Sequence, residues 1–123
     1  MAENKKILVV EDDKLLSDLL LRKLGSTFDL LHANTGEEAL KILSEKKPAL
    51  VLLDILLPGM DGFEVLKKIK QSPTLKEIPV VILSNLGQES DIKKGKELGA
   101  ERFLVKVTLT LDDIVKEVEK VFS

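Results

Sequence analysis

Five short apolar runs recur along the chain, and their lengths and spacing constrain the fold more than any other feature of the sequence. The runs are Ile7–Val10, Phe28–Leu31, Leu50–Leu53, Val80–Leu83 and Phe103–Val105. Each is too short for a helix, is rich in β-branched residues and leucine, and lacks the alternation of apolar and polar residues that half-exposed strands show. The runs therefore predict strands that are buried on both faces of a parallel sheet.

The segments between these runs have helical spacing and helical end signals. Helices are predicted over Lys14–Leu24, after Thr35, from Asp61 to about Lys70, from about Glu89 to Leu98, and from near Thr110 to the C-terminus. Asp13, Thr35 and Asp61 are residue types that cap a helix N-terminus. A glutamate follows both Thr35 and Asp61 three residues later, which is typical of a capping box.

Strand and helix therefore alternate five times within 123 residues. Alternating elements of this length form a parallel sheet with helices on both faces. A closed eight-unit barrel would need about twice as much chain. We predict one α/β, doubly wound, flavodoxin-like domain over residues 1–123, with five parallel strands in the order 2-1-3-4-5 and five helices.

The composition excludes several classes of protein. Nineteen Lys and Arg residues stand against 21 Asp and Glu residues, so the chain lacks the basic excess typical of nucleic-acid-binding domains. It contains no cysteine, which excludes disulfides and cysteine-based redox chemistry. No apolar stretch approaches the ~20 residues of a membrane helix or resembles a secretion signal. We expect a cytoplasmic protein that contacts neither membrane nor nucleic acid.

Polar residues follow four of the predicted strands at the point where each strand ends. They are Glu11-Asp12-Asp13 after the first strand, Asp54 after the third, Ser84 at the end of the fourth and Lys106 after the fifth. These four strands are consecutive neighbours in the predicted order, and sites in open α/β sheets lie beyond the carboxyl ends of the strands. We therefore expect acids, a hydroxyl and an ammonium group at one rim.

The converging acids predict a hard divalent cation. Two carboxylates ~4 Å apart repel by roughly 4 kcal/mol at an effective dielectric constant near 20, so a cation or a proton must lie among them. Oxygen ligands without histidine or cysteine favour Mg²⁺. A carboxylate nucleophile at Asp54, with Lys106 and Ser84 beside it, is suited to in-line phosphoryl transfer.

Each of these residues also has an ordinary structural interpretation. Glu11 to Asp13 could form only a turn and a helix cap, Asp54 could be a solvated loop residue, and Lys106 a surface lysine. Phe103 could be plain core. The functional interpretation depends on their joint placement at one edge of the sheet.

The segments that carry these residues resemble the receiver domains of two-component response regulators over nearly the whole chain. The matching segments are Ile7–Asp13, Leu52–Gly62, Pro79–Ser84, Gly99-Ala100 and Phe103–Lys106. The resemblance implies that Asp54 accepts a phosphoryl group from a histidine kinase or phosphotransfer protein, and that the only reactions catalysed are the domain's own phosphorylation and dephosphorylation. It also implies that Asp12, Asp54 and the backbone carbonyl of Leu56 bind Mg²⁺, with Glu11 acting through water.

The resemblance further implies a conformational switch. Ser84 and Lys106 would bond the phosphoryl group, and Phe103 would change rotamer together with Ser84. This would alter the face formed by the fourth helix, fifth strand and fifth helix, where a downstream protein binds. The sequence leaves open whether the domain stands alone or belongs to a longer regulator.

Several positions depart from the pattern of that family. Val107 stands where a proline often follows the lysine through a cis peptide bond, and we expect no cis bond here because it would cost ~2.5–4 kcal/mol. Asn85 replaces a small residue, so it either crowds the pocket or adds a hydrogen bond. Glu101-Arg102 replaces the paired aspartates of a DNA-binding subclass. Aliphatic Leu56 and Leu86 predict slow hydrolysis of the phosphoryl group.

Three other functions compete with this interpretation. An aspartyl phosphatase needs a second acid two residues after its nucleophile, where this chain has Leu56. A flavodoxin-like binding module needs an anion-binding loop after the first strand, where three acids would repel phosphate. A receiver that is never phosphorylated remains open. His32 is predicted to be structural or exposed, at the end of the second strand, and Lys93, Lys94 and Lys96 to form a solvated face.

Overall fold

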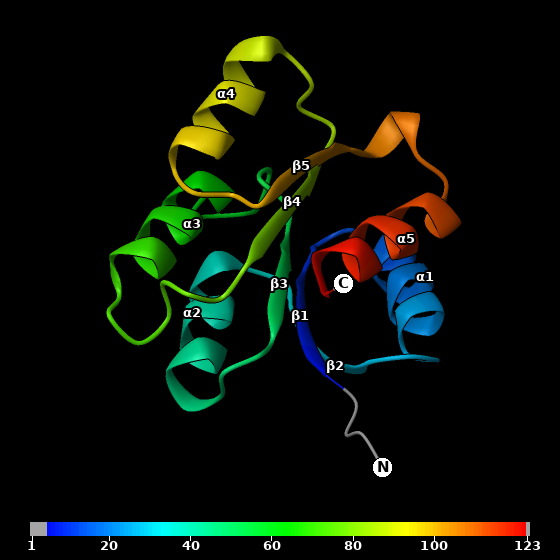
Figure 1. Cartoon of the computed structure of the whole chain (residues 1–123), viewed down its shortest axis with the longest axis horizontal. Coiled ribbons are helices and arrows are strands. Elements are labelled where there is room, and N and C mark those ends of the chain that lie inside the picture. The colour runs from blue at the N-terminus through cyan, green and yellow to red at the C-terminus, as the bar shows by residue number, and fades with distance from the viewer. Residues whose placement is uncertain (1–4, 123) are drawn as a thin grey trace.

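Five parallel strands form the centre of the molecule in a computed structural model that describes residues 5–122 (Figure 1). The strands are β1 (Lys6–Val10), β2 (Asp29–Ala33), β3 (Leu50–Leu53), β4 (Val80–Ser84) and β5 (Arg102–Val105). The helices are α1 (Lys14–Leu24), α2 (Gly36–Glu45), α3 (Gly62–Gln71), α4 (Glu89–Glu97) and α5 (Leu111–Phe122). The strand order β2-β1-β3-β4-β5 confirms the predicted topology.

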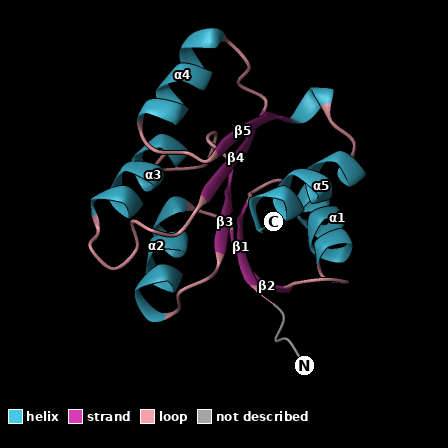
Figure 2. Cartoon of the chain, viewed as in Figure 1, coloured by secondary structure: helices cyan, strands magenta, loops and turns pink. Residues whose placement is uncertain are grey.

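Helices cover both faces of the sheet, with α2, α3 and α4 on one side and α1 and α5 on the other (Figure 2). Alternate side chains of each strand therefore enter two different apolar cores. In β1, Leu8 and Val10 pack on the α2–α3 side, whereas Ile7 and Val9 pack on the α1–α5 side. Two apolar faces explain why the strands read as continuous apolar runs.

Burial differs between the central and the edge strands. Every residue of β3 and β4 is buried, as predicted, but most of β2 and β5 is only half-buried. The prediction of full burial is wrong for these two strands because each pairs with one neighbour only. The predicted start of the second strand is also wrong. Phe28 precedes β2 and packs against Phe122, with ring centroids 5.6 Å apart.

The predicted helix caps are present. The side chains of Asp13, Thr35 and Asp61 accept hydrogen bonds from backbone N–H groups three residues later, at 3.0, 3.1 and 3.0 Å. The last helix has a reciprocal cap, in which Thr110 Oγ1 accepts from Asp113 N–H and Asp113 Oδ2 accepts from Thr110 N–H. A short 3₁₀ helix, η1 (Lys106–Thr108), precedes it and was not predicted.

Candidate functional site

The sheet itself fixes the backbone of two acidic residues. Beyond the last paired residues of β1 and β3, the N–H of Asp54 donates to the carbonyl of Val10 at 3.0 Å, and the N–H of Glu11 donates to the carbonyl of Ala33 at 3.0 Å. The backbones of Glu11 and Asp54 therefore lie side by side, just beyond the carboxyl ends of the adjacent strands β1 and β3. Gly62, the first residue of α3, lies against the Asp54 carbonyl so closely that a Cβ atom would collide with it.

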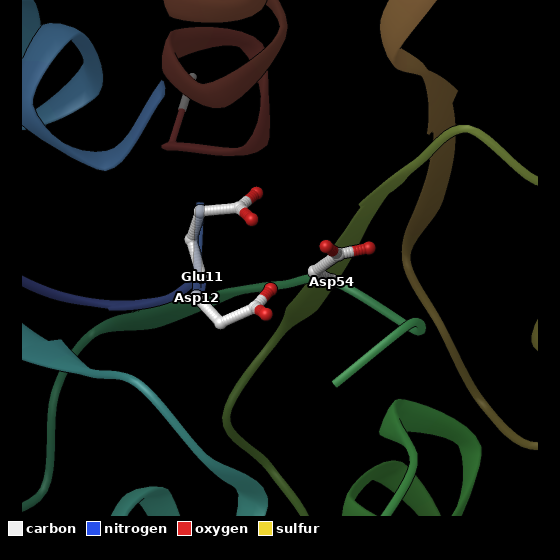
Figure 3. A group of neighbouring side chains, drawn as sticks. All are labelled: Glu11, Asp12 and Asp54. Carbon is white, nitrogen blue, oxygen red and sulfur yellow. The ribbon is translucent and has the colours of Figure 1, made fainter. Parts of the chain in front are cut away.

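Three carboxylates face a common space beyond these strand ends (Figure 3). Glu11, Asp12 and Asp54 each offer an oxygen, and these oxygens lie within 4.8 Å of one another. Glu11 and Asp54 are buried, with 2% and 5% of their surface exposed, whereas Asp12 is exposed. The predicted acidic cluster is therefore assembled, closed on its inner side and open to solvent at Asp12.

Lys106 lies between the two buried carboxylates. Its Nζ is 2.7 Å from Glu11 Oε1 and 2.9 Å from Asp54 Oδ2, and its side chain is largely covered. Burial alone would lower the pKa of Lys106, but the hydrogen bonds and charges of Glu11 and Asp54 outweigh it and raise that pKa above its usual value. The lysine is therefore a firmly charged group in direct contact with Asp54.

Burial has the opposite effect on Glu11. It raises the pKa of this carboxyl group, and the neighbouring charge of Asp54 adds to the rise, while hydrogen bonds from Lys106 and the Asp13 N–H oppose it. One ammonium group thus offsets only part of the charge of three acids. The remaining acidic oxygens are a donor set that fits a hard divalent cation such as Mg²⁺ or Mn²⁺.

The Asp54 carboxylate is held at both oxygens. Lys106 contacts Oδ2, and the backbone N–H of Leu56 donates to Oδ1 at 3.3 Å. Leu56 therefore lies beside the acid, and the residue is 57% exposed. Coordination of a metal by its carbonyl stays a prediction.

Ser84 and Phe103, the two predicted switch residues, lie on the neighbouring strands β4 and β5. Ser84 ends β4, pairs in register with Val105 and is fully buried. Its Oγ accepts a hydrogen bond from the N–H of Leu86 at 3.3 Å, so the loop after β4 engages the hydroxyl. Phe103 pairs in register with Ile82 and is half-buried.

His32 has a contact that sequence reasoning missed. It lies within β2, not at its end, and its Nε2 is 3.0 Å from the carbonyl oxygen of Glu11. The predicted structural role is thus specific, because the imidazole helps to hold the turn that carries the acids. No local signal in the sequence predicts this contact, because it depends on the strand register that pairs Val9 with His32 and brings the ring close to the end of β1.

Two of the departures from the family pattern lie at the surface. Asn85 is exposed, and Val107 is 78% exposed. The described residues contain no cis peptide bond, as expected. On α4, Lys93 pairs with Glu97 at 3.9 Å, and Lys94 Nζ lies 4.6 Å from the centre of the Phe63 ring. Lys93 and Lys94 are exposed, as predicted.

Large exposed apolar side chains are few in the described part of the chain, and they were not predicted as a group. They are Leu15, Leu19, Leu56 and Val107. Three of them lie close in sequence to site residues, since Leu15 follows Asp12 by three positions, Leu56 follows Asp54 by two, and Val107 follows Lys106 directly. Among residues 5–122, none of the helices has the length and apolarity needed to cross a membrane.

Comparisons with known proteins agree with this geometry. The profile of the response regulator receiver domain matches residues 7–119. The chain is 41% identical over 104 residues to the alkaline phosphatase synthesis transcriptional regulatory protein PhoP of Bacillus subtilis strain 168, covering 84% of this chain and 42% of that protein. It therefore spans less than half the length of this relative.

Two solved structures are similar over almost their full length. The phosphorylated cyanobacterial phytochrome response regulator RcpA superposes with a TM-score of 0.85 at 34% identity, over 97% of this chain and 91% of that one. The Mn²⁺-bound form of response regulator Rcp1 gives a TM-score of 0.83 at 37% identity, over 95% and 91% of the two chains.

Proposed function

Because the chain belongs to the response regulator receiver family and is a receiver domain of two-component signalling, we propose that Asp54 is its phosphoacceptor. Asp54 takes the phosphoryl group from a phosphohistidine of a histidine kinase or phosphotransfer protein. The resulting aspartyl phosphate changes the conformation of the domain, which then controls a partner or output domain. Domains of this family act with such kinases and outputs.

One observation supports this assignment above the others: the nearly buried Asp54 carboxylate is held by Lys106 and by the Leu56 N–H, with two further acids within reach. In the proposed reaction, an Asp54 oxygen attacks phosphorus, the phosphorus–nitrogen bond to the donor imidazole breaks, and the electron pair stays on that nitrogen. Lys106 stays beside Asp54 and offsets negative charge on the transferred group. The product is an acyl phosphate on Asp54.

We propose Mg²⁺ as the cofactor. Asp12, Asp54 and the Leu56 carbonyl would bind it directly, and Glu11 through water. When bound, the cation supplies positive charge against the phosphoryl oxygens. Asp12 supports its own direct role, because its exposed carboxylate lies near that of Asp54.

The proposed switch consists of Ser84 and Phe103. A phosphate adds roughly −1.5 to −2 charges and three acceptor oxygens at neutral pH. Ser84 would then leave the Leu86 N–H and donate to a phosphate oxygen, and Phe103 would change rotamer. Such bonds exist in one state only and so shift the equilibrium between two arrangements. The output contact is proposed for the face formed by α4, β5 and α5.

The surroundings of the site bear on the donor and on the lifetime of the phosphate. Exposed Leu15, Leu56 and Val107 support a protein donor, since exposed apolar groups beside a polar site suit a protein contact. Aliphatic Leu56 and Leu86 position an attacking water poorly, so the aspartyl phosphate should persist. We propose a cytoplasmic location and no catalysis beyond the domain's own phosphorylation and dephosphorylation.

The direct test is incubation with acetyl phosphate and Mg²⁺ followed by intact mass spectrometry. The wild type should gain roughly 80 Da, one phosphoryl group, and Asp54→Asn should gain nothing. Asp18→Asn is the matched control, because Asp18 is exposed and pairs only loosely with Lys14 at 3.7 Å. An adduct that persists in Asp54→Asn would move the acceptor elsewhere, and no adduct in the wild type would favour a receiver that works unphosphorylated.

A further inference from the structure

Helix α4 is weakly anchored, and the residue that it buries lies against the sheet. Its only buried residue is Gly95, and its N-cap, Gln88, makes no side-chain hydrogen bond to the helix. A glycine in a helix interior costs about 1 kcal/mol relative to alanine, so this position does not favour the helix by itself. The advantage of glycine at position 95 must therefore come from the groups that can pack against the helix there.

The missing side chain of Gly95 leaves a slot that two apolar groups fill. A Cβ atom at this position would lie 2.9 Å from Cδ1 of Ile82 and 2.9 Å from Cδ2 of Phe103. Such distances are far shorter than the 3.5–4.0 Å separation of carbon atoms in contact. Any side chain here must displace the Ile82 methyl, the Phe103 ring or the helix.

The Phe103 ring has more freedom to move than Ile82. Ile82 is fully buried in the central strand β4, whereas Phe103 lies on the edge strand β5 and is half-buried. The ring also faces the helix that carries Gly95, so the position of the ring and that of α4 depend on each other through this slot.

We propose that Gly95 is a positioning residue of the switch: its bare Cα lets the Phe103 ring lie against α4 and thereby couples the ring to the helix. This inference rests on the proposed function, in which Phe103 changes rotamer when Asp54 is phosphorylated. When the ring leaves the slot, α4 keeps only the contact with Ile82 there and becomes free to shift. Gly95 thus links the phosphorylation site to the face formed by α4, β5 and α5.

The ring can be followed directly by fluorine NMR. The chain has four phenylalanines and neither tyrosine nor tryptophan, so labelling with fluorophenylalanine gives a small set of resonances. Phe103→Leu assigns the relevant one by its loss. In Gly95→Ala, we expect the Phe103 resonance to move in the unphosphorylated protein and to respond differently to acetyl phosphate with Mg²⁺. Ser90→Ala, an exposed change in the same helix, should leave it unaltered.

A double-mutant cycle separates this role from helix propensity. Alanine favours a helix over glycine, so once Ile82→Val has removed the Cδ1 methyl and Phe103→Leu has removed the ring, Gly95→Ala should slow amide hydrogen exchange in residues 89–97 by on the order of fivefold. With Phe103 present, the same change should slow exchange less or accelerate it, because the ring and the new methyl compete for one space. The two effects should therefore not add.

The outcomes are distinct. A moved Phe103 resonance or non-additive exchange supports the coupling. An unaltered resonance together with equal exchange effects in both backgrounds overturns it. Intact mass of the same samples reports phosphorylation separately. If the wild type forms no adduct, the proposed function fails. If it forms the adduct while the Phe103 resonance is unaltered and the exchange effects are equal, only the role of Gly95 fails.

Discussion

Helices α4 and α5 cover opposite faces of the sheet beside the edge strand β5, yet they are held in different ways (Figure 1). Helix α5 buries Ile114 and Val118, has a reciprocal cap at Thr110, and pairs with α1 through Lys23 and Asp112 at 2.8 Å. Helix α4 buries only Gly95 and has no side-chain cap. One flank of β5 is anchored and the other is loose.

The difference in anchoring between α4 and α5 indicates how phosphorylation at the rim, as proposed, could be transmitted to α4. Lys106 contacts Asp54 and leads through η1 into the anchored helix, whereas Phe103, three residues earlier on β5, meets the loose one. Elements that move in a switch belong to the least stable parts of a protein. The anchored helix keeps the site in place while α4 is free to respond.

Truncation of one isoleucine in each helix should give the largest effect and tests directly whether α5 is anchored more firmly than α4. Ile114→Ala should destabilise the domain by about 2–4 kcal/mol, because Ile114 is buried in the core below α5. Ile92→Ala in α4 should cost less than about 1 kcal/mol, because Ile92 is half-exposed. Urea unfolding measures both values. Similar losses in the two variants would mean that α4 is anchored as firmly as α5.

The caps provide a second contrast. Thr110→Ala should cost about 1 kcal/mol, because it removes the acceptor for the Asp113 N–H at the start of α5. Gln88→Ala, at the corresponding position of α4, should change the free energy of unfolding by less than about 0.5 kcal/mol, because Gln88 makes no capping bond. Equal effects of the two substitutions would remove the cap as a cause of the difference.

The sequence predicted the strands and the rim residues from local patterns, and the strand order followed from the doubly wound fold class. Apolar runs fixed the strands, and the residue after each run fixed what lies at the rim. The predicted start of the second strand was wrong at Phe28, because this apolar residue precedes β2 and packs against Phe122 near the C-terminus. Nothing local distinguishes such a residue from a strand residue.

The contacts that the sequence could not supply are all long-range. The particular pairing of Lys106 with both Glu11 and Asp54 joins residues that follow three different strands, and the His32 contact depends on strand register. Gly95 reads as an ordinary weak helix position, and only the packing of Phe103 against it gives it a role. The gathering of the acids and the lysine at one rim was predictable, but the individual hydrogen bonds and packing contacts were not.

Phosphorylation itself should sharpen the contrast. In acetyl phosphate and Mg²⁺, amide exchange in α4 should change severalfold, while exchange in α5 should change less than about twofold, because the loose helix opens at low free-energy cost. Hydrogen exchange with peptide-level mass spectrometry measures both segments in one sample. Asp54→Asn is the control and should show neither change. A larger response in α5 than in α4 would reverse the proposed direction of transmission.

The smallest effect concerns the ion pair that ties α5 to α1. The hydrogen bond and charge of Lys23 lower the pKa of the exposed Asp112 carboxyl group. An aspartate whose folded pKa lies below its unfolded value, about 3.9, stabilises the fold at pH values above that unfolded value. It loses this contribution as the pH falls through the folded pKa.

Lys23→Met should therefore raise the Asp112 pKa toward its ordinary value in a carboxyl NMR titration. Lys14→Met, which removes the pair between Lys14 and Asp18 within α1, should leave the Asp112 pKa unaltered. Added salt should shrink the difference between Lys23→Met and wild type, because exposed charges are screened. If Asp112 has the same pKa in Lys23→Met as in the wild type, the anchoring of α5 to α1 comes from apolar packing and the cap alone.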